Sequence, residues 1–457
     1  MKKAAVLFLA AVMLLALLSA CGDGPDGSFA WIDPPQAEQK NDSLTIYSLN
    51  IGAPSLLERA VTFFRASHPG VRIELILEDY NEGQGYESYE KTAAEVMAGK
   101  GPDILIIDKI TDVEKLVRQG VFADMEPFFE ADGFDWTPYN QVVMDGGVWD
   151  GRRYMIPLSY SFPLLFSTRS ALEKADFNVD ACGDFRGFLE ETTRYMEDPA
   201  HTSTPFFMSF LVAQPAAYGG IAMADYNTGQ VDLSSPDLRA GLQWMKTLNE
   251  RYPAPVVGYG GVVGAAAVRD GEALWTISFD AGQGFYWQYG ALKTVGEAVM
   301  MPIRDLNGGI QAQLESSLGV RANSENLQNA YDFIKILLSK EVQSLPGSPV
   351  GMRLSVLNEA MYDFYQKPTN SPTHFGWLKR GEQGFTSTMN DYDATDYPTE
   401  EEFEQFMDYT REISGTYYSG TVDAYLYGAM RPFLYEGMDY GEALEEAQRR
   451  MELRLTE

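Results

Sequence analysis

Apolar runs alternate with amphipathic runs between residues 44 and 107, and this alternation restricts the fold of the chain more than any other feature. Three short runs rich in apolar and β-branched residues predict strands, at 44–49, 71–77 and 103–107. Two longer runs with apolar residues at helical spacing predict helices between them, at 55–68 and 86–98. Strands and helices that alternate with short connections predict an α/β fold with a parallel sheet, which binds ligands at the carboxyl ends of its strands.

The first 21 residues have the layout of an export signal. Lys2 and Lys3 precede an uncharged apolar stretch at residues 4–17, which is too short and wrongly flanked for a lasting membrane span. The Leu-Ser-Ala-Cys run that ends at Cys21 resembles the lipobox of bacterial lipoproteins. This resemblance implies cleavage before Cys21, which then carries lipid; an ordinary secretory signal with an accidental cysteine is the alternative. Residues 22–40, rich in Gly, Pro, Asp and Gln, are expected to form a flexible tether.

Size and charge limit the architecture and the partners. The chain has 457 residues, of which 45% are hydrophobic, so the part beyond the tether exceeds a single-core domain and two lobes are expected. The formal net charge of −30 repels nucleic acid and anionic lipid, so neither is an expected partner, and membrane contact is expected through the lipid anchor only. Cys182 is the only cysteine after Cys21, so a disulfide framework is excluded and Cys182 is expected to be buried.

Features further along the chain predict a hairpin, a crossing between the lobes and two long helices. The Asp150-Gly151 pair predicts the turn of a hairpin. The apolar segment 155–166 follows it and is expected to run, extended, from one lobe into the other. Apolar side chains at helical spacing predict amphipathic helices that begin near Asn323 and at Gly441.

Several segments resemble, in order and spacing, those of the family 1 extracellular solute-binding proteins of ABC importers, the maltose-binding-protein-like group. The resemblance extends over most of the chain after the tether and is carried by residues 44–49, FFRASHPGV at 63–71, MAGKGPDI at 97–104, residues 116–127, residues 151–167, GEALWTI at 271–277, SLGVRANS at 317–324 and ALEEAQRR at 443–450. It implies a two-lobed periplasmic-binding-protein-like α/β fold of type 2, with hinge strands and a ligand cleft between the lobes.

The same resemblance implies an organisation and a role. The expected role is that of a monomeric receptor on the outer side of the cell membrane, which captures a solute, expected to be a carbohydrate, by cleft closure and delivers it to ABC permease subunits. It implies no cofactor and no catalysis. The expected organisation is a lipoprotein signal peptide at 1–20, a lipidated tether at 21–40, a first lobe at 41–158 and 310–362, and a second lobe at 159–309 and 363–457.

Residues that follow strands, or that lie in the crossing segment, are the expected ligand contacts. An aromatic ring covers the C–H face of a sugar, while Asp, Asn and Ser side chains bond its hydroxyls. The expected contacts are Tyr47, Asn50, Asp79, Tyr80 and Asp108 in the first lobe, Tyr160 and Ser161 in the crossing segment, and Tyr218, Trp275, Phe279, Asp280 and Trp287 in the second lobe. Asp103, which starts a strand after Pro102, is expected instead to be a structural cap or turn residue.

Departures from the family leave the ligand class open. In sugar-binding members a carboxylate sometimes stands where this chain has Ser161, and the run 278–281 lacks their small-residue turn followed by tryptophan. The same receptor role for a polyamine or a peptide is therefore an alternative, since a polyamine is bound by carboxylates with aromatic rings.

An enzyme is the competing class, and the sequence gives no positive sign of one. The chain has no Gly-x-Ser-x-Gly elbow, no His-Glu-x-x-His motif and no Walker loop, so a secreted glycoside hydrolase with two carboxylates is the remaining enzymatic alternative. Asp391, Asp393, Thr395 and Glu402 have the spacing of a calcium loop, but Asp396 takes the position that needs glycine. A solvated acidic loop is therefore expected there, and no metal site.

Overall fold

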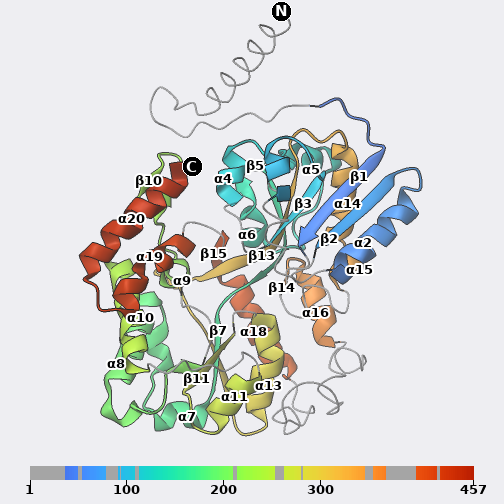
Figure 1. Ribbon diagram of the computed structural model, residues 1–457. Helices are drawn as coiled ribbons and strands as arrows, with labels where there is room; N and C mark the ends of the chain where they lie inside the picture. The colour runs from blue at the N-terminus through green and yellow to red at the C-terminus, as the bar shows by residue number, and fades with distance from the viewer. Residues whose placement is uncertain are drawn as a thin grey trace, which may run out of the picture.

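The computed structural model describes residues 37–49, 54–78, 91–92, 94–108, 113–208, 214–252, 262–278, 281–344, 354–366, 398–418 and 423–456. Within these ranges the chain forms a large and a small sheet with helices packed around each. Figure 1 shows the two parts one above the other, joined by segments that run between them. This arrangement agrees with the predicted α/β class.

The large sheet has seven strands in the order β14-β6-β13-β3-β1-β2, with β15 also paired to β13. β1 runs parallel to β2 and β3, whereas β13 runs antiparallel to β3 and β6. The three predicted strands of the first segment are confirmed as β1, β2 and β3. The strands of this sheet are β1 Ser43–Leu49, β2 Arg72–Glu78, β3 Ile104–Asp108, β6 Met155–Ser161, β13 Ile310–Val320, β14 Leu354–Ser355 and β15 Ile413–Tyr418.

Amphipathic helices cover this sheet. In α2 the buried residues Leu56, Ala60 and Phe64 recur every four positions, and α2 packs against α14, which confirms the helices predicted at 55–68 and near Asn323. The helix predicted at 86–98 lies partly outside the described residues. The helices of this part are α2 Pro54–Ser67, α4 Val113–Arg118, α5 Glu126–Asp132, α6 Gln141–Asp145, α14 Leu327–Leu338, α15 Lys340–Gln343 and α16 Asn358–Gln366. The helix α18 Glu400–Arg411 packs between the two parts, with Phe406 stacked on both Phe162 and Phe285.

The small sheet has the order β12-β7-β11-β8. Its residues Phe166 and Met300 belong to the core of the large sheet, whereas Trp275 and Met301 belong to a second apolar core. Cys182 lies buried in that core, as predicted, and burial raises the pKa of its thiol to about 12. The strands are β7 Leu164–Thr168, β8 Phe207–Met208, β11 Trp275–Ser278 and β12 Ala298–Pro302, with a separate β9 Ala224–Asp225 and β10 Gln230–Val231 pair. The helices are α7 Arg169–Lys174, α8 Phe185–Glu197, α9 Pro215–Gly219, α10 Pro236–Arg251, α11 Val262–Arg269, α12 Ala281–Gly284, a π-helical turn Phe285–Tyr289, α13 Gly290–Lys293, α19 Asp423–Tyr435 and α20 Tyr440–Thr456, the last as predicted.

Two short connections cross between the sheets. β6 ends at Ser161 and β7 begins at Leu164, so the predicted crossing in segment 155–166 is confirmed. Residues 303–309 return the chain from β12 to β13. β15 belongs to the large sheet, although it falls in the range expected for the second lobe, and α19 after it packs on the helices of the small sheet. The division of the chain into lobes at particular residues stays a prediction.

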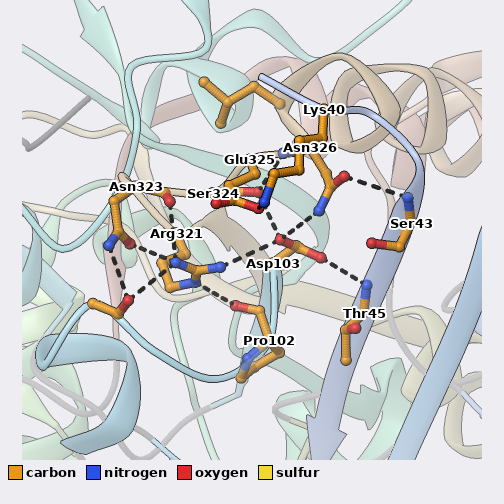
Figure 2. Close-up of polar contacts among 12 residues, drawn as sticks. Lys40, Ser43, Thr45, Pro102, Asp103, Arg321, Asn323, Ser324, Glu325 and Asn326 are labelled. Atoms are coloured by element: carbon orange, nitrogen blue, oxygen red, sulfur yellow. Dashed lines mark hydrogen bonds and ion pairs between the residues drawn. The ribbon is translucent and has the colours of Figure 1, made fainter. Parts of the chain in front are cut away.

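A buried carboxylate joins three distant segments at one end of the large sheet. Asp103 is 5% exposed; its Oδ2 accepts from the Thr45 backbone amide at 2.9 Å, and its Oδ1 accepts from Ser324 Oγ at 2.7 Å and from Asn326 Nδ2 at 3.3 Å. Arg321 forms an ion pair with the same carboxylate at 3.4 Å (Figure 2). The predicted structural role of Asp103 is therefore confirmed, since its bonds fix β1 and the start of α14 to the loop before β3.

Candidate functional site

Two strands of the large sheet end against the middle of β13. β3 ends at Asp108, which lies opposite Ser316, and β15 ends at Tyr418, which lies opposite Leu314. Because β3 and β15 run in opposite directions along the same edge of β13, their carboxyl ends meet beside Glu315. We call this place the strand junction; it comprises Gln313, Glu315 and Ser316 of β13, Asp108 of β3, and Tyr417 and Tyr418 of β15.

The sequence of β13 explains why polar groups gather at the junction. Alternate residues point to opposite faces of a strand. Ile310, Ala312, Leu314, Leu318 and Val320 all belong to the main apolar core, whereas the residues between them include Gln311, Gln313, Glu315 and Ser317. The ladder with β6 also shifts register on both sides of Ser316, and such a bulge changes the direction of nearby side chains. One face of β13 is therefore apolar and packed, and the other is polar.

Hydrogen bonds hold the polar groups of the junction in place. Gln313 Nε2 donates to Glu315 Oε1 at 2.9 Å, and the Tyr417 hydroxyl donates to Gln313 Oε1 at 3.4 Å. Glu315 is 1% exposed. A buried carboxylate costs free energy unless hydrogen bonds compensate it. The presence of Glu315 in the middle of the sheet therefore indicates that this part of the interior is polar.

An aromatic pair lies at the carboxyl end of β15, where Tyr418 is paired with Leu314. A hairpin of β4 Val148–Trp149 and β5 Arg152–Arg153 turns at Asp150 and Gly151, both at positive φ, which confirms the predicted Asp-Gly turn. The hairpin places Trp149 on Tyr418, with ring centroids 6.1 Å apart and planes 20° from parallel. The Tyr418 hydroxyl donates to the Gly146 carbonyl at 3.3 Å, and both rings are half-buried. Flat ring faces, together with the polar side chains that β13 carries at the same strand ends, suit a ligand with C–H faces and hydroxyls.

The return crossing to β13 is fixed by one aspartate. Asp305 is 2% exposed; its Oδ2 accepts from Ser414 Oγ of β15 at 2.6 Å and from Gln311 Nε2 at 2.7 Å, and its Oδ1 accepts from the Asn307 and Gly309 amides at 2.8 and 3.0 Å. Burial alone raises the pKa of Asp305, but these hydrogen bonds outweigh it and hold the pKa below its ordinary value. The turn that carries the chain between the two sheets is thus tied to β15.

The lowered pKa of Asp305 makes its contribution to stability depend on pH. Asp305→Asn is expected to lower the free energy of unfolding by about 1–3 kcal/mol near neutral pH. Because the folded-state pKa is the lower one, the contribution is fully present above the unfolded-state pKa and is lost as pH falls through the folded-state pKa. Urea denaturation at a series of pH values should therefore show a constant gap between wild type and variant above about pH 5, and a shrinking gap below about pH 4. A gap that stays the same through the acid range would contradict this account of Asp305.

The structure places five of the sequence-predicted contacts in the interior, namely four aromatic side chains and Ser161, which is 0% exposed. Tyr47 is 2% exposed in a small core beneath β1 and β3, and Tyr160 is 1% exposed in the main core, where burial raises the pKa of its hydroxyl despite bonds to Asn140 and Thr410. Tyr218 is 4% exposed and Trp275 is fully buried, both in the core of the small sheet. A ligand reaches any of these side chains only if the packing around it opens.

Ser161 has a different role, because it joins the two parts. Its Oγ accepts from the backbone amide of Ala281 at 2.8 Å. Ala281 begins α12, so this bond holds the start of that helix against the first crossing. Ser161 also lies opposite Gln313 of the junction.

The remaining predicted contacts fall wholly or partly outside the described residues. Asn50, Asp79, Tyr80, Phe279 and Asp280 lie outside them, whereas for Asp108 and Trp287 the backbone is described. Asn50, Asp79 and Asp280 come one or two residues after β1, β2 and β11, and Asp108 ends β3. Because β3, β1 and β2 are parallel neighbours, their carboxyl ends share one edge of the sheet.

Sequence reasoning missed Trp149, Gln313, Glu315, Tyr417 and Tyr418. The signal for β13 was present as the run QAQLESS, in which polar and apolar residues alternate within an otherwise apolar segment. Only the pairing of β13 with β15, about a hundred residues further along the chain, shows that the tyrosines lie beside it.

Within the described ranges, no three His, Cys, Asp or Glu side chains gather as a metal site. Of the residues in the calcium-like spacing, Glu402 is described, and it binds Lys293 and the Tyr289 hydroxyl. Among the helices that the structure describes, none is long and apolar enough to span a bilayer.

The family is shown by sequence. A family model described as bacterial extracellular solute-binding protein matches residues 59–345, which is more than half of the chain. The chain therefore belongs to this family of extracellular binding proteins, as its sequence motifs predicted. No curated protein matches the sequence.

Solved structures show the fold. A sugar transporter from Rhizobium etli in an open conformation matches with a TM-score of 0.59 and 15% identity, over 90% of this chain and 98% of that chain. The cyclic α-maltosyl-1,6-maltose binding protein from Arthrobacter globiformis matches with a TM-score of 0.57 and 14% identity, over 91% and 99%. An ABC substrate-binding protein from Listeria monocytogenes in complex with cycloalternan matches with a TM-score of 0.55 and 13% identity, over the same shares. The predicted two-lobed solute-binding fold is confirmed.

Proposed function

We propose that this protein is the receptor of an ABC importer, that it binds a carbohydrate between its two lobes and that it delivers the sugar to the permease. The family match over residues 59–345 carries the solute-binding part of the proposal. The carbohydrate part is supported by the structural relatives, several of which are named for sugars or were solved with them. It is also supported by the mixture of aromatic rings, amide and carboxylate at the strand junction.

The proposed ligand site is the strand junction together with the segments that follow the strands. Trp149 and Tyr418 supply ring faces, and the half-buried Gln313 supplies an amide, which the buried Glu315 holds in place. Asn50, Asp79, Tyr80, Asp108, Phe279, Asp280 and Trp287 are proposed to surround it, with Ser161 connecting the two sides. Tyr47, Tyr160, Tyr218 and Trp275 are proposed to form the packed walls behind these groups, because they are buried.

Closure of the lobes on the ligand is the proposed signal to the permease. The crossings at 162–163 and 303–309 are short and tied by Ser161 and Asp305, so they suit a hinge between two rigid parts. A ligand that contacts both sides favours the closed state by its differential affinity for it. The protein is proposed to bind without catalysis, as the family does, and to act as a monomer with no cofactor.

Anchoring is proposed to come from the N-terminus. Residues 1–20 are proposed as a lipoprotein signal peptide, Cys21 as the lipidated residue and residues 22–36 as the tether; all of these lie outside the described residues. Residues 37–40 were also predicted as tether, but they are bound to the folded body, for example through the Lys40 amide, which donates to the Glu325 carbonyl at 2.7 Å. The net charge of −30 supports an anchor that depends on lipid and not on attraction to anionic headgroups. The protein would then stand on the outer face of the membrane beside its permease.

A thermal-shift screen of the chain from Gly22 onward tests the proposed function. Mono- and oligosaccharides are compared with polyamines and short peptides, because a ligand of the folded state raises the melting temperature by mass action. A rise with one sugar, and none with its close isomers, is the expected result. A rise with polyamines or peptides alone would support the receptor role but reject a carbohydrate as its ligand. Chemical conversion of the sugar during the assay would reject the proposal that the protein binds without catalysis.

A further inference from the structure

A surface groove lies between α5 and α14, away from the strand junction. It is a cavity of about 400 Å³, and Figure 1 shows the two helices near the start of β1. The groove is lined by Pro127, Phe128, Ala131, Asp132, Gln328, Tyr331 and Lys335. Neither the family match nor the ligand proposal gives this α5–α14 groove a role.

The groove combines an apolar wall with a charged rim. Pro127, Phe128 and Ala131 supply the wall, and the Phe128 and Tyr331 rings lie 5.7 Å apart. At the rim, Asp132 Oδ2 accepts from Lys335 Nζ at 2.9 Å and from the Tyr331 hydroxyl at 2.8 Å. Grooves lined by aromatic rings are suited to proline-rich segments, which lose little conformational freedom on binding.

The chain itself enters the fold next to this groove. Gln39 Oε1 accepts from the backbone amide of Leu327 at 2.9 Å, and Asn41 Oδ1 accepts from that of Gln328 at 3.2 Å. Gln39 Nε2 also donates to the Ser324 carbonyl at 2.9 Å. Gln39, within the range predicted for the tether, is therefore fixed at the first turn of α14, and Gln328 of that turn lines the groove.

The preceding segment has the composition that the groove requires. Residues 29–35 read Phe-Ala-Trp-Ile-Asp-Pro-Pro, whereas residues 22–28 contain only Gly, Asp, Pro and Ser. An extended chain gains about 3.3 Å per residue, so the four to eight residues before Gln39 reach roughly 13–26 Å. α14 rises about 1.5 Å per residue, so Leu327 to Lys335 spans roughly 12 Å. The segment is thus long enough to cover the whole groove.

We propose that residues 29–35 bind in the α5–α14 groove of their own chain, with Trp31 and the two prolines against Phe128 and Ala131. The anchored Gln39 makes this an intramolecular event, so the local concentration of the segment is on the order of millimolar and a weak contact suffices. If Cys21 carries lipid as proposed, only residues 22–28 then remain as a free spacer between the membrane and the folded body.

Photo-crosslinking tests this proposal in the full-length chain, expressed with its own leader and without added ligand. The photoreactive residue p-benzoylphenylalanine replaces Trp31, and mass spectrometry maps its products. Crosslinks within the same molecule to residues 127–131 or 328–335 are expected. The same probe at Gly24 should give few crosslinks there. Because no ligand takes part, a failure here is distinct from a failure of the transport proposal.

Ala131→Arg is the matched block of the groove, because Ala131 is exposed and a long charged side chain there fills the groove. It should reduce the Trp31 crosslinks and increase chymotrypsin cleavage after Phe29 and Trp31, each by about tenfold, with the melting temperature unchanged. The proposal would be overturned by crosslinks from Trp31 to other parts of the chain, to a second copy or to another membrane protein. It would also be overturned if Ala131→Arg changed neither the crosslinking nor the cleavage.

Discussion

Asp103→Ala is expected to lower the free energy of unfolding by about 3–5 kcal/mol, because it removes a buried acceptor and leaves four donors without it. Thr45 N, Ser324 Oγ, Asn326 Nδ2 and Arg321 all direct hydrogen atoms at this carboxylate. The loss includes the free-energy cost of leaving the Arg321 guanidinium without its ion-pair partner, because the Arg321 side chain is only 13% exposed. Because the bonds connect β1, β3 and α14, the variant should unfold at a lower urea concentration as a whole and not by local fraying.

Equilibrium urea unfolding followed by circular dichroism measures this effect, with Glu359→Ala as the control. Glu359 also pairs with a cation, Lys340, but both side chains are about half exposed, at 60% and 44%. An exposed pair contributes up to about 1 kcal/mol, so the control should remain close to wild type. Equal losses of unfolding free energy in the two variants would show that the buried network around Asp103 contributes no more to stability than an exposed ion pair.

Trp275→Ala is expected to cost about 3–5 kcal/mol, since it creates a cavity in the core of the small sheet. Trp275 is fully buried in β11, and its ring meets Phe177 edge to face with centroids 5.7 Å apart. The cluster that contains Trp275 is distinct from the cluster that fills the large sheet, so the part of the molecule around β11 should show the larger drop in hydrogen-exchange protection.

Trp275→Phe serves as the matched variant, because it keeps an aromatic ring in the same space and should lose clearly less stability. Measured on the folded fraction, the ligand affinity of Trp275→Phe should equal that of wild type, as expected for a residue of the packed wall. A large loss of affinity with little loss of stability would instead make Trp275 a direct ligand contact.

The fold was predictable because its main signals are local. Apolar periodicity between residues 44 and 107 predicted three parallel strands and the helix α2, and the Asp150-Gly151 pair predicted the hairpin that carries Trp149. The apolar segment 155–166 became the crossing of β6 and β7. In each case a short stretch of sequence is sufficient, because backbone preference and burial act on the same few residues.

The candidate site was less predictable because it is made by pairing across long distances. Gln313 and Tyr417 come into contact only because β13 and β15 pair in parallel. Composition also does not separate an aromatic side chain that lines a cleft from one that fills a core, so Tyr160 and Trp275 were predicted as contacts although both are buried. Glu315 was missed for the opposite reason, since it is an acidic residue that is buried inside a sheet. Its position is explained only by the pairing that brings the carboxyl ends of β3 and β15 together beside it.

Titration calorimetry of the sugar that the screen identifies tests the central claim most directly, on wild type and on Tyr418→Ala. Tyr435→Ala is the matched control, since Tyr435 is 60% exposed on α19 and belongs to no part of the strand junction. Loss of a stacked ring at the junction is expected to weaken binding about tenfold, while the control binds as wild type. Equal affinity in all three proteins, each shown to be folded, would contradict a carbohydrate site at the strand junction.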